Sequence, residues 1–304
     1  MDAIEKAAML IKEKEIKIGR HKYNQLKTKL AKDGILSPDD LLKIEAFEKT
    51  QKKSMSKNQA EKIIEYTKKV SQPAPKKEYE FKPVELSNTF LKTFSLIYKG
   101  HKGDPLKFVK NIETKNNILP LIYYFTKDAR FFNCKNVVDH EFNYSGKIKQ
   151  SIPSFEKGLL IIGNFGNGKS SSMNVFHRIF SRLDNLKFRQ YSANDVIESY
   201  ENCATPDEKR SFWFQHNKGV IYYDDVRTER IASNYGKTNL FKDIIEKREV
   251  RNLKTYITCN FKTGSPGDVK EALIEFAEKY ENRVFDRLFS MFNIIIFTGG
   301  SFRK

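Results

Sequence analysis

The sequence predicts an α/β fold, in which a parallel β-sheet carries helices on its faces. From residue 157 onward, short apolar runs alternate with stretches of helical spacing, as expected for strands that alternate with helices. One apolar run leads into a glycine-rich turn, and another ends in two adjacent carboxylates. The candidate strands are residues 159–163, 186–191, 220–224, 255–259 and 293–298.

The first candidate strand runs directly into a complete G-x-x-x-x-G-K-[ST] motif, and residues with helical spacing follow it. Its glycines let backbone N–H groups turn inward, where they and the following helix N-terminus complement a phosphate chain. The lysine would reach the β- and γ-phosphates and the first serine would place its hydroxyl on Mg²⁺. A chance glycine-rich loop is the alternative, but the flanking strand and helix favour a site for a nucleoside triphosphate. The residues are Gly163, Asn164, Phe165, Gly166, Asn167, Gly168, Lys169 and Ser170, with Ser171 as a second hydroxyl.

A later apolar segment ends in Asp224 and Asp225. Such a strand delivers an acid to the same end of the sheet as the phosphate loop, where Asp224 would hold Mg²⁺ through its water shell. Asp225 would orient and polarise the attacking water. Two adjacent aspartates can also form a helix cap or a turn, and the phosphate loop upstream favours the nucleotide site.

Four further polar residues are candidates for the same site. Asn260 ends a predicted strand, where it could bind the hydrolytic water or the γ-phosphate, or serve as an ordinary turn asparagine. Arg283 and Arg287 are four residues apart, so on a helix they share a face that could project toward an anion or simply be solvated. Arg303 places another arginine at the C-terminal tail.

The composition of the 304 residues suggests a polyanionic partner. There are 55 Lys and Arg against 38 Asp and Glu, a net charge of +17, which is typical of proteins that bind nucleic acid but also of a lysine-rich coding bias. The three cysteines are far apart and indicate neither a disulfide framework nor a zinc site. The chain has no apolar run long enough for a transmembrane helix and no signal-peptide pattern at its start, so we expect a cytoplasmic protein.

The composition and residue pattern of the chain change near residue 71. Residues 1–70 are charged and helical in pattern, which predicts a small all-α module. Residues 71–87 begin with a stretch that contains two prolines and small residues, which predicts a linker, and residues 88–304 form the nucleotide-binding domain.

One segment of that domain interleaves basic and aromatic residues. Such a pattern suits a surface on which bases stack on rings while cations follow the backbone of a single strand. Packing in the core or at an interface is the alternative for the three adjacent aromatics of the segment, residues 212–214. The segment spans residues 189–214 and contains Arg189, Tyr191, Tyr200, Lys209, Arg210, Phe212, Trp213 and Phe214.

Taken in chain order, these motifs resemble those of AAA+ ATPases of the helicase-loader type, the DnaC/DnaI family, and of the related IstB transposition ATPases. The resemblance covers roughly residues 85–304 and lies in G-N-F-G-N-G-K-S, Y-Y-D-D-V-R-T-E, Y-I-T-C-N, N-R-V-F-D-R-L and the terminal S-F-R. It implies an AAA+ P-loop core of five parallel strands flanked by helices, with a minimal lid. It also implies that Asn260 is the sensor-1 residue, that Arg283 or Arg287 is the arginine finger, and that Arg303 is the sensor-2 arginine. The family usually carries glycine where this chain has Arg227. At this position, in the loop of residues 225–236, the chain departs from the family pattern.

The resemblance further implies a function. In these proteins an N-terminal helical module grips the replicative helicase, while the ATPase domains form an oligomer that holds single-stranded DNA. We therefore expect an ATPase that uses ATP and Mg²⁺ to load or remodel a replicative helicase in a bacterial or phage-infected cell, with residues 1–70 docking to the helicase. Two alternatives are an IstB-like ATPase that regulates a transposase on duplex DNA, and a slow ATP-gated adaptor of a phage or mobile element. The sequence leaves open the partner, the size and symmetry of the oligomer, the preference for single- or double-stranded DNA, and which arginine is the finger.

Overall fold

The computed structural model describes residues 20–33, 36–53, 78–100, 103–144, 146–234 and 236–302. The chain divides into two compact units, Met1–Lys76 and Lys77–Lys304. No helix in the described ranges is long and apolar enough to cross a membrane.

The first unit contains a pair of packed helices, α2 (Arg20–Asp33) and α3 (Pro38–Lys53). Leu26, Leu36 and Ile44 are buried between them, and the rings of Tyr23 and Phe47 stack with centroids 4.6 Å apart. Two acidic residues lie in the first turn of α3, where the positive end of the helix dipole favours negative charge. Residues 1–19 and 54–70 of the predicted module lie outside the described residues.

The second unit is built on a five-stranded sheet in the order β4-β5-β8-β3-β9. All neighbouring strands pair in parallel, as predicted. The second predicted strand begins later than expected, because residues around Leu186 form a turn in which Lys187 N–H donates to Leu183 O. The strands are β3 (Gly158–Gly163), β4 (Arg189–Ser192), β5 (Ile221–Asp224), β8 (Thr255–Asn260) and β9 (Phe292–Phe297).

Strands β3 and β8 are buried along their whole length, because both faces of the sheet are covered. Side chains alternate between the faces: Leu159 and Ile161 of β3 pack in one hydrophobic core, and Leu160 and Ile162 pack in the other. The near-continuous apolar character of this strand in the sequence follows directly from its two-sided burial.

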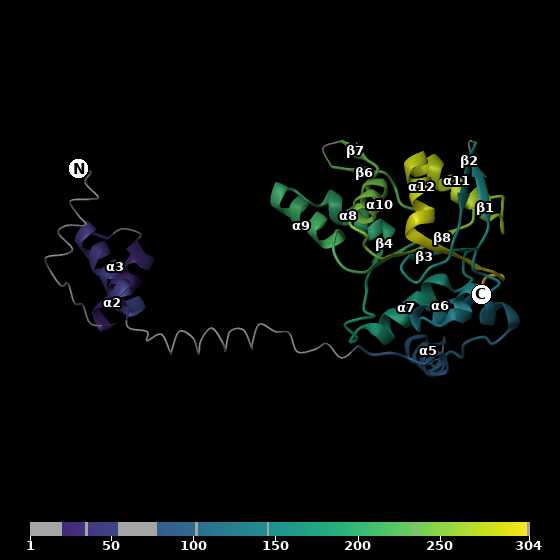
Figure 1. Cartoon of the computed structure of the whole chain (residues 1–304), viewed down its shortest axis with the longest axis horizontal. Helices are drawn as coiled ribbons and strands as arrows, with labels where there is room; N and C mark the ends of the chain where they lie inside the picture. The colour runs from purple at the N-terminus through teal and green to yellow at the C-terminus, as the bar shows by residue number, and fades with distance from the viewer. Residues whose placement is uncertain are drawn as a thin grey trace. The chain divides into compact units, whose positions relative to one another are not determined.

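The first of these cores is formed with α5 (Pro83–Ile97), α6 (Ile112–Phe125) and α7 (Lys169–Phe180), which lie together on one side of the sheet (Figure 1). Aromatic rings fill it, with Phe176 of α7 4.9 Å from Phe125 and 5.1 Å from Phe90. Helix α5 begins inside the segment expected to be linker, because Leu86 in its first turns is fully buried in this core. The short helix η1 (Ala129–Asn133) follows α6.

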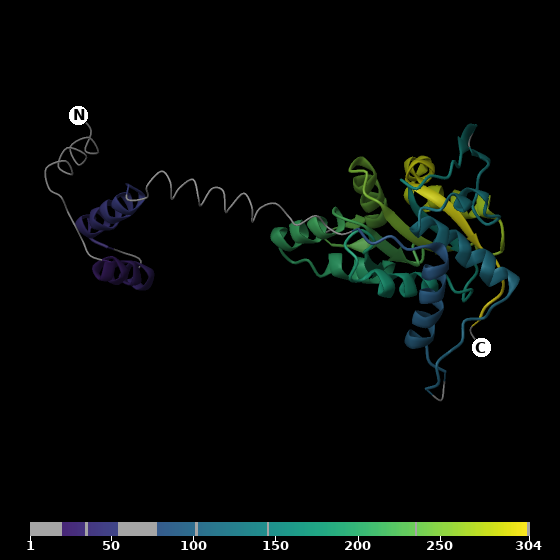
Figure 2. The same cartoon turned by 60° about the horizontal axis from the view of Figure 1, so that its bottom comes forward.

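The second core is formed with the helices of the other side of the sheet. They are α8 (Ala193–Glu201), α9 (Pro206–His216), α10 (Leu240–Val250), α11 (Val269–Tyr280) and α12 (Asn282–Met291). A hairpin of β1 (Glu141–Tyr144) and β2 (Lys147–Gln150) lies beside α12 (Figure 1 and Figure 2), where Phe142 packs on Phe289. A second, shorter hairpin joins β6 (Ala232–Ser233) and β7 (Lys237–Thr238), and the sequence analysis predicted neither hairpin.

Candidate nucleotide-binding site

The glycine-rich loop joins the end of β3 to the start of α7, as predicted. Gly166 and Gly168 have φ values of 72° and 93°, a left-handed region that glycine adopts without a steric penalty. A Cβ atom on Gly163 would lie 2.6 Å from the carbonyl oxygen of Phe297, so the close approach of β9 requires glycine there. The amide of Asn167 donates to the same carbonyl over 2.9 Å and fixes the loop against β9. The loop is therefore held at the carboxyl end of the sheet.

Lys169 is buried within the curve of the loop. Its Nζ donates to the carbonyl oxygens of Gly163 at 2.9 Å and Asn164 at 2.7 Å, and to Oδ1 of Asn260 at 3.0 Å. These contacts hold the ammonium beside the space that backbone N–H groups and the start of α7 surround, where a phosphate chain would lie.

Ser170 and Asp224 meet at the same edge of the sheet. The Ser170 hydroxyl donates to Asp224 Oδ1 over 2.7 Å, and Tyr222 donates to the same oxygen over 2.6 Å. Burial, and then the adjacent carboxylate, raise the pKa of Tyr222 well above its ordinary value, so this phenol stays a donor. A hydroxyl and a carboxylate this close are the hard oxygen ligands that Mg²⁺ prefers, with waters and phosphate oxygens completing its shell. Ser170 and Asp224 therefore fit a Mg²⁺ ion.

Asp225 and Asn260 lie next to this pair. Asp225 has a φ of 57°, and its backbone N–H donates to the hydroxyl of Thr258 over 3.1 Å. Asn260 is the last residue of β8, and its side-chain amide donates to Asp225 Oδ1 over 3.2 Å while its carbonyl oxygen accepts from Lys169. The Asn260 side chain thus bridges the phosphate-loop lysine and the second aspartate.

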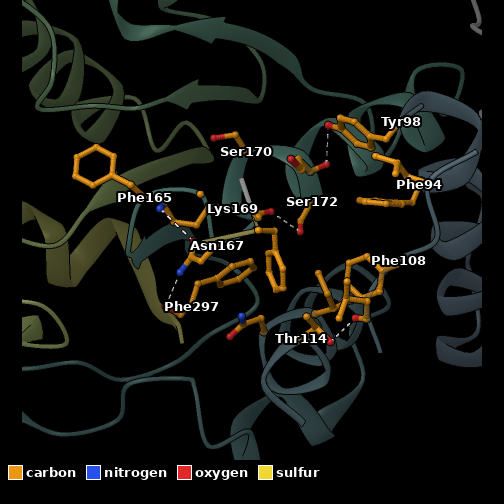
Figure 3. Close-up of a pocket in the computed structure, with 18 of the residues that line it drawn as sticks. Phe94, Tyr98, Phe108, Thr114, Phe165, Asn167, Lys169, Ser170, Ser172 and Phe297 are labelled. Atoms are coloured by element: carbon orange, nitrogen blue, oxygen red, sulfur yellow. Dashed lines mark hydrogen bonds between the residues drawn. The ribbon is translucent and has the colours of Figure 1, made fainter. Parts of the chain in front are cut away.

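A cavity of about 340 Å³ opens beside the loop (Figure 3). One side is formed by the loop, Asp225 and Asn260, and the other by apolar side chains from α5, the following segment, α6, β9 and the tail. Figure 3 shows Phe94, Tyr98 and Phe108 facing the loop from the α5 side. The polar end suits phosphates and the apolar walls suit a flat base, so this cavity is the candidate site for a nucleotide. The apolar side includes Phe94, Tyr98, Phe108, Ile118, Phe297 and Phe302, none of which the sequence analysis assigned to the site.

The two arginines of α12 do not line this cavity, and they differ from each other. Arg287 is half-buried and forms ion pairs with two carboxylates of α10, Glu249 and, at 3.9 Å, Glu246. Arg283, one turn earlier, is exposed, and its side chain forms no hydrogen bond or ion pair with another described residue. Arg303 lies outside the described residues, although the backbone N–H of Phe302 donates to Gly166 O over 2.9 Å and brings the tail to the loop.

The basic and aromatic segment divides into a structural and an exposed part. Phe212 is buried in the core, and the guanidinium of Arg189 donates to the carbonyl oxygens of Gln215 and Lys218. Phe214 is 65% exposed, and Lys218 Nζ lies 4.1 Å from the centre of its ring. Trp213 is intermediate and has Lys247 Nζ 4.0 Å from its ring.

The fold and the geometry of the site together define the class of core domain to which the second unit belongs. A five-stranded parallel sheet, a phosphate loop after the strand between β8 and β9, and an acidic strand end beside it constitute a P-loop nucleotide-binding core of the AAA+ type.

The solved structures that resemble the chain include two whose descriptions name replication proteins of the DnaC/DnaI kind. One is described as the DnaC helicase loader, with 16% sequence identity and a TM-score of 0.42 over 63% of this chain and 94% of that one. The other is DnaI, with 21% identity and a TM-score of 0.37 over 47% of this chain and 73% of that one. No family model matches the chain, and neither does any curated protein sequence. The two names are those of the family that the sequence motifs resemble.

Proposed function

We propose that the protein is a Mg²⁺-dependent ATPase that loads or remodels a replicative helicase on single-stranded DNA. The observation that carries the ATPase part is the convergence of five residues, from two strand ends and one helix start, at one edge of the sheet: Lys169, Ser170, Asp224, Asp225 and Asn260. These residues lie up to 91 positions apart in the chain, so the shared fold alone brings them together.

Each residue has a distinct part in the proposed hydrolysis. Lys169 binds the β- and γ-phosphates, and Ser170 and Asp224 hold the Mg²⁺ ion, which neutralises phosphate charge when bound. Asp225 accepts a hydrogen bond from the attacking water and orients it in line with the γ-phosphate, and the Asn260 amide fixes the Asp225 carboxylate. The aromatic walls of the cavity hold the base, which positions the phosphate chain in the loop.

The cavity lacks an arginine from α12 of its own chain, so a second copy would supply one. Arg283 is the better candidate for this finger, since its guanidinium is exposed and Arg287 is already paired with Glu249. A cation delivered between subunits stabilises the charge that develops on the γ-phosphate during transfer, and it makes turnover depend on assembly.

The helicase and DNA parts of the proposal rest on other observations. The resemblance of the motifs to the helicase-loader family suggests the partner, and the helix pair α2–α3 offers the partly exposed Leu41 beside a small core as part of a docking face. The net charge of +17 and the exposed Phe214 with its neighbour Lys218 suggest contact with a single strand, through base stacking and phosphate neutralisation.

A loading assay tests the whole proposal. The full chain is mixed with a hexameric replicative helicase, ATP, Mg²⁺ and DNA that carries a single-stranded region, and duplex unwinding is measured. We expect the chain to accelerate unwinding and the variant lacking residues 1–76 to lose this effect while it retains ATP binding. Unwinding that is the same with and without the chain, together with stimulation of a transposase on duplex DNA, would contradict the loader and favour the IstB-like alternative.

A further inference from the structure

Arg227 occupies an unusual backbone position in the loop that follows β5. Its φ is 82°, a left-handed value that is unfavourable for any residue with a Cβ atom and that glycine adopts freely. Strained residues of this kind persist only where the surrounding contacts hold them, and they gather at functional sites. Arg227 lies two residues after Asp225, so its contacts bear on the position of the catalytic loop.

The guanidinium of Arg227 connects two elements. Its side chain is 5% exposed, and one terminal nitrogen donates to the Ala272 carbonyl of α11 over 2.7 Å and to the carboxylate of Glu275. The other terminal nitrogen donates to the main-chain carbonyl of Asn260, at the end of β8. The group also lies over the ring of Phe276, 5.0 Å from its centre. A single buried cation therefore ties the end of β8 to α11.

The backbone of Arg227 is fixed to the same helix. Its N–H donates to Glu229 at 2.7 Å and to the hydroxyl of Tyr280 at 3.1 Å, and its carbonyl accepts from Lys279 at 2.6 Å. Glu229 is itself buried and accepts from Tyr280, while Lys279 lies 3.0 Å from its carboxylate. The loop therefore cannot shift relative to α11 without breaking several buried polar contacts.

We propose that Arg227 is a positioning residue for hydrolysis, which holds Asn260 and Asp225 in register by anchoring both to α11. This inference rests on the proposed ATPase function. The side chain of Asn260 bridges Lys169 and Asp225 at distances of 3.0 and 3.2 Å, and a small displacement of its main chain would break this bridge. The planar guanidinium reaches several acceptors in fixed directions at once, which a lysine ammonium does not.

The contacts of Arg227 with α11 also connect the candidate nucleotide site to α12, the helix that carries Arg283, the proposed arginine finger. Helix α11 ends at Tyr280 and α12 begins at Asn282, so Arg283 follows directly from the helix to which Arg227 binds. Contact of a second copy with α12 would therefore bear on the helix that fixes Asp225 and Asn260.

The test compares Arg227→Gly with two other variants of the full chain. Glycine accepts a φ of 82°, so this variant removes the guanidinium without adding backbone strain. Arg227→Lys keeps the charge and reaches fewer acceptors. Arg230→Gly is the matched control, since Arg230 lies in the same loop, and its exposed side chain pairs only with the carboxylate of Glu201 among the described residues.

We expect Arg227→Gly to lower kcat about tenfold or more, while KM for ATP and the affinity for a fluorescent ATP analogue change less than about twofold. Arg227→Lys should recover part of kcat, and Arg230→Gly should match the wild type. An unchanged kcat in Arg227→Gly would overturn the proposal. A parallel loss of kcat, nucleotide affinity and Tm that lysine does not relieve would also overturn it, because that result is the signature of a purely structural arginine.

Hydrogen exchange separates this proposal from the ATPase proposal. If the wild type hydrolyses no ATP, the proposed function fails, and the anchoring is read from backbone exchange at residues 225–229 and 258–261. Arg227→Gly should exchange faster there than Arg230→Gly and the wild type. Equal exchange in all three would refute the anchoring, whatever the ATPase result.

Discussion

The hydroxyl of Ser170 donates to Asp224 Oδ1 over 2.7 Å, so the two residues predicted to hold Mg²⁺ are in direct contact. Ser170 lies in the first turn of α7, and Asp224 ends β5, 54 positions later in the chain. The Ser170 hydroxyl and the Asp224 carboxylate would hold a Mg²⁺ ion at this edge of the sheet, Asp224 through the water shell of the ion, and the ion would neutralise phosphate charge. The contact therefore preorganises a cation site without any rearrangement of the backbone.

Replacement of Ser170 by alanine should raise the Mg²⁺ concentration needed for half-maximal ATPase activity several-fold, because one oxygen ligand is lost. The variant should still fold, since the Ser170 side chain is only partly buried and alanine removes a single hydroxyl. A Mg²⁺ titration of steady-state hydrolysis measures the effect. Ser181→Ala, at the other end of the same helix, is the control and should leave the titration unchanged. Identical midpoints for Ser170→Ala and the wild type would exclude Ser170 as a ligand.

The two arginines of α12 should respond differently to alanine. Arg283→Ala should leave the binding of ATP to the monomer nearly intact and lower turnover, a loss that can reach about 10³-fold for an arginine finger. Arg287→Ala removes a partner of Glu249 within the same subunit, so we expect mainly a lower Tm and a smaller loss of turnover.

Mixing experiments test whether Arg283 acts between subunits. Inactive Arg283→Ala protein is combined with inactive Lys169→Ala protein, and some interfaces then contain an intact loop and an intact finger. Recovered turnover supports a shared site. Co-assembly of the two variants without any recovered turnover would show that Arg283 does not complete a site in another subunit.

Binding to single-stranded DNA should weaken as salt is added, because each neutralised phosphate releases condensed counterions. Phe214→Ala should lower affinity by about fivefold or more without changing this salt slope, since stacking of a base on the ring carries no charge. Lys218→Ala should lower the slope instead. Fluorescence anisotropy of a labelled oligonucleotide at several salt concentrations measures both. An affinity for DNA that does not change with salt would show that the basic residues behind the +17 charge do not contact DNA phosphates.

His216 provides a pH dependence of stability. It is 2% exposed and its Nδ1 lies 3.0 Å from the hydroxyl of Tyr223. Burial, and then the cations of Arg189 and Arg248, lower the pKa of His216 from 6.5 to about 4. The unfolded chain therefore binds more protons between these values, so the stabilisation is complete above pH 6.5 and is lost as the pH falls toward 4. The loss from this group is about 3 kcal/mol over that range.

Denaturant unfolding at pH 7 and pH 5 tests this dependence in the wild type and in His216→Gln. Glutamine can still bond to Tyr223 but does not titrate, so the variant should lose less stability between the two pH values than the wild type. Equal losses would show that His216 does not carry the dependence.

The sequence predicts the parts of the site that short motifs encode. A turn that cradles phosphates needs glycine, lysine and serine at fixed spacing, and an acidic strand end needs an apolar run before it, so Lys169, Ser170 and Asp224 are visible without a structure. Parallel strands bring their carboxyl ends to one edge, which is why Asn260 could be placed near them. The order of the strands, however, depends on how the helices pack.

Other features depend on contacts between distant segments and leave no local signal. Tyr98 and Phe108 reach the cavity because α5 and α6 pack against α7, and their spacing in the sequence indicates only a helix and a loop. Arg283 and Arg287 look equivalent until α10 supplies Glu249 to one of them. In the sequence, Arg227 is notable only because the family usually has glycine at this position. Its proposed positioning role depends on contacts with residues 33 to 53 positions away in the chain.

ATP hydrolysis by the Asp225→Asn variant, with wild type and Lys169→Ala as references, tests the proposed catalytic site. Asparagine keeps the size of the side chain and a carbonyl oxygen but removes the charge that polarises water. We expect Asp225→Asn to bind ATP and Mg²⁺ like the wild type and to hydrolyse ATP about 10²-fold more slowly, and we expect Lys169→Ala to lose ATP binding. Hydrolysis by Asp225→Asn at the wild-type rate would contradict the proposed role of Asp225 and the catalytic site built around it.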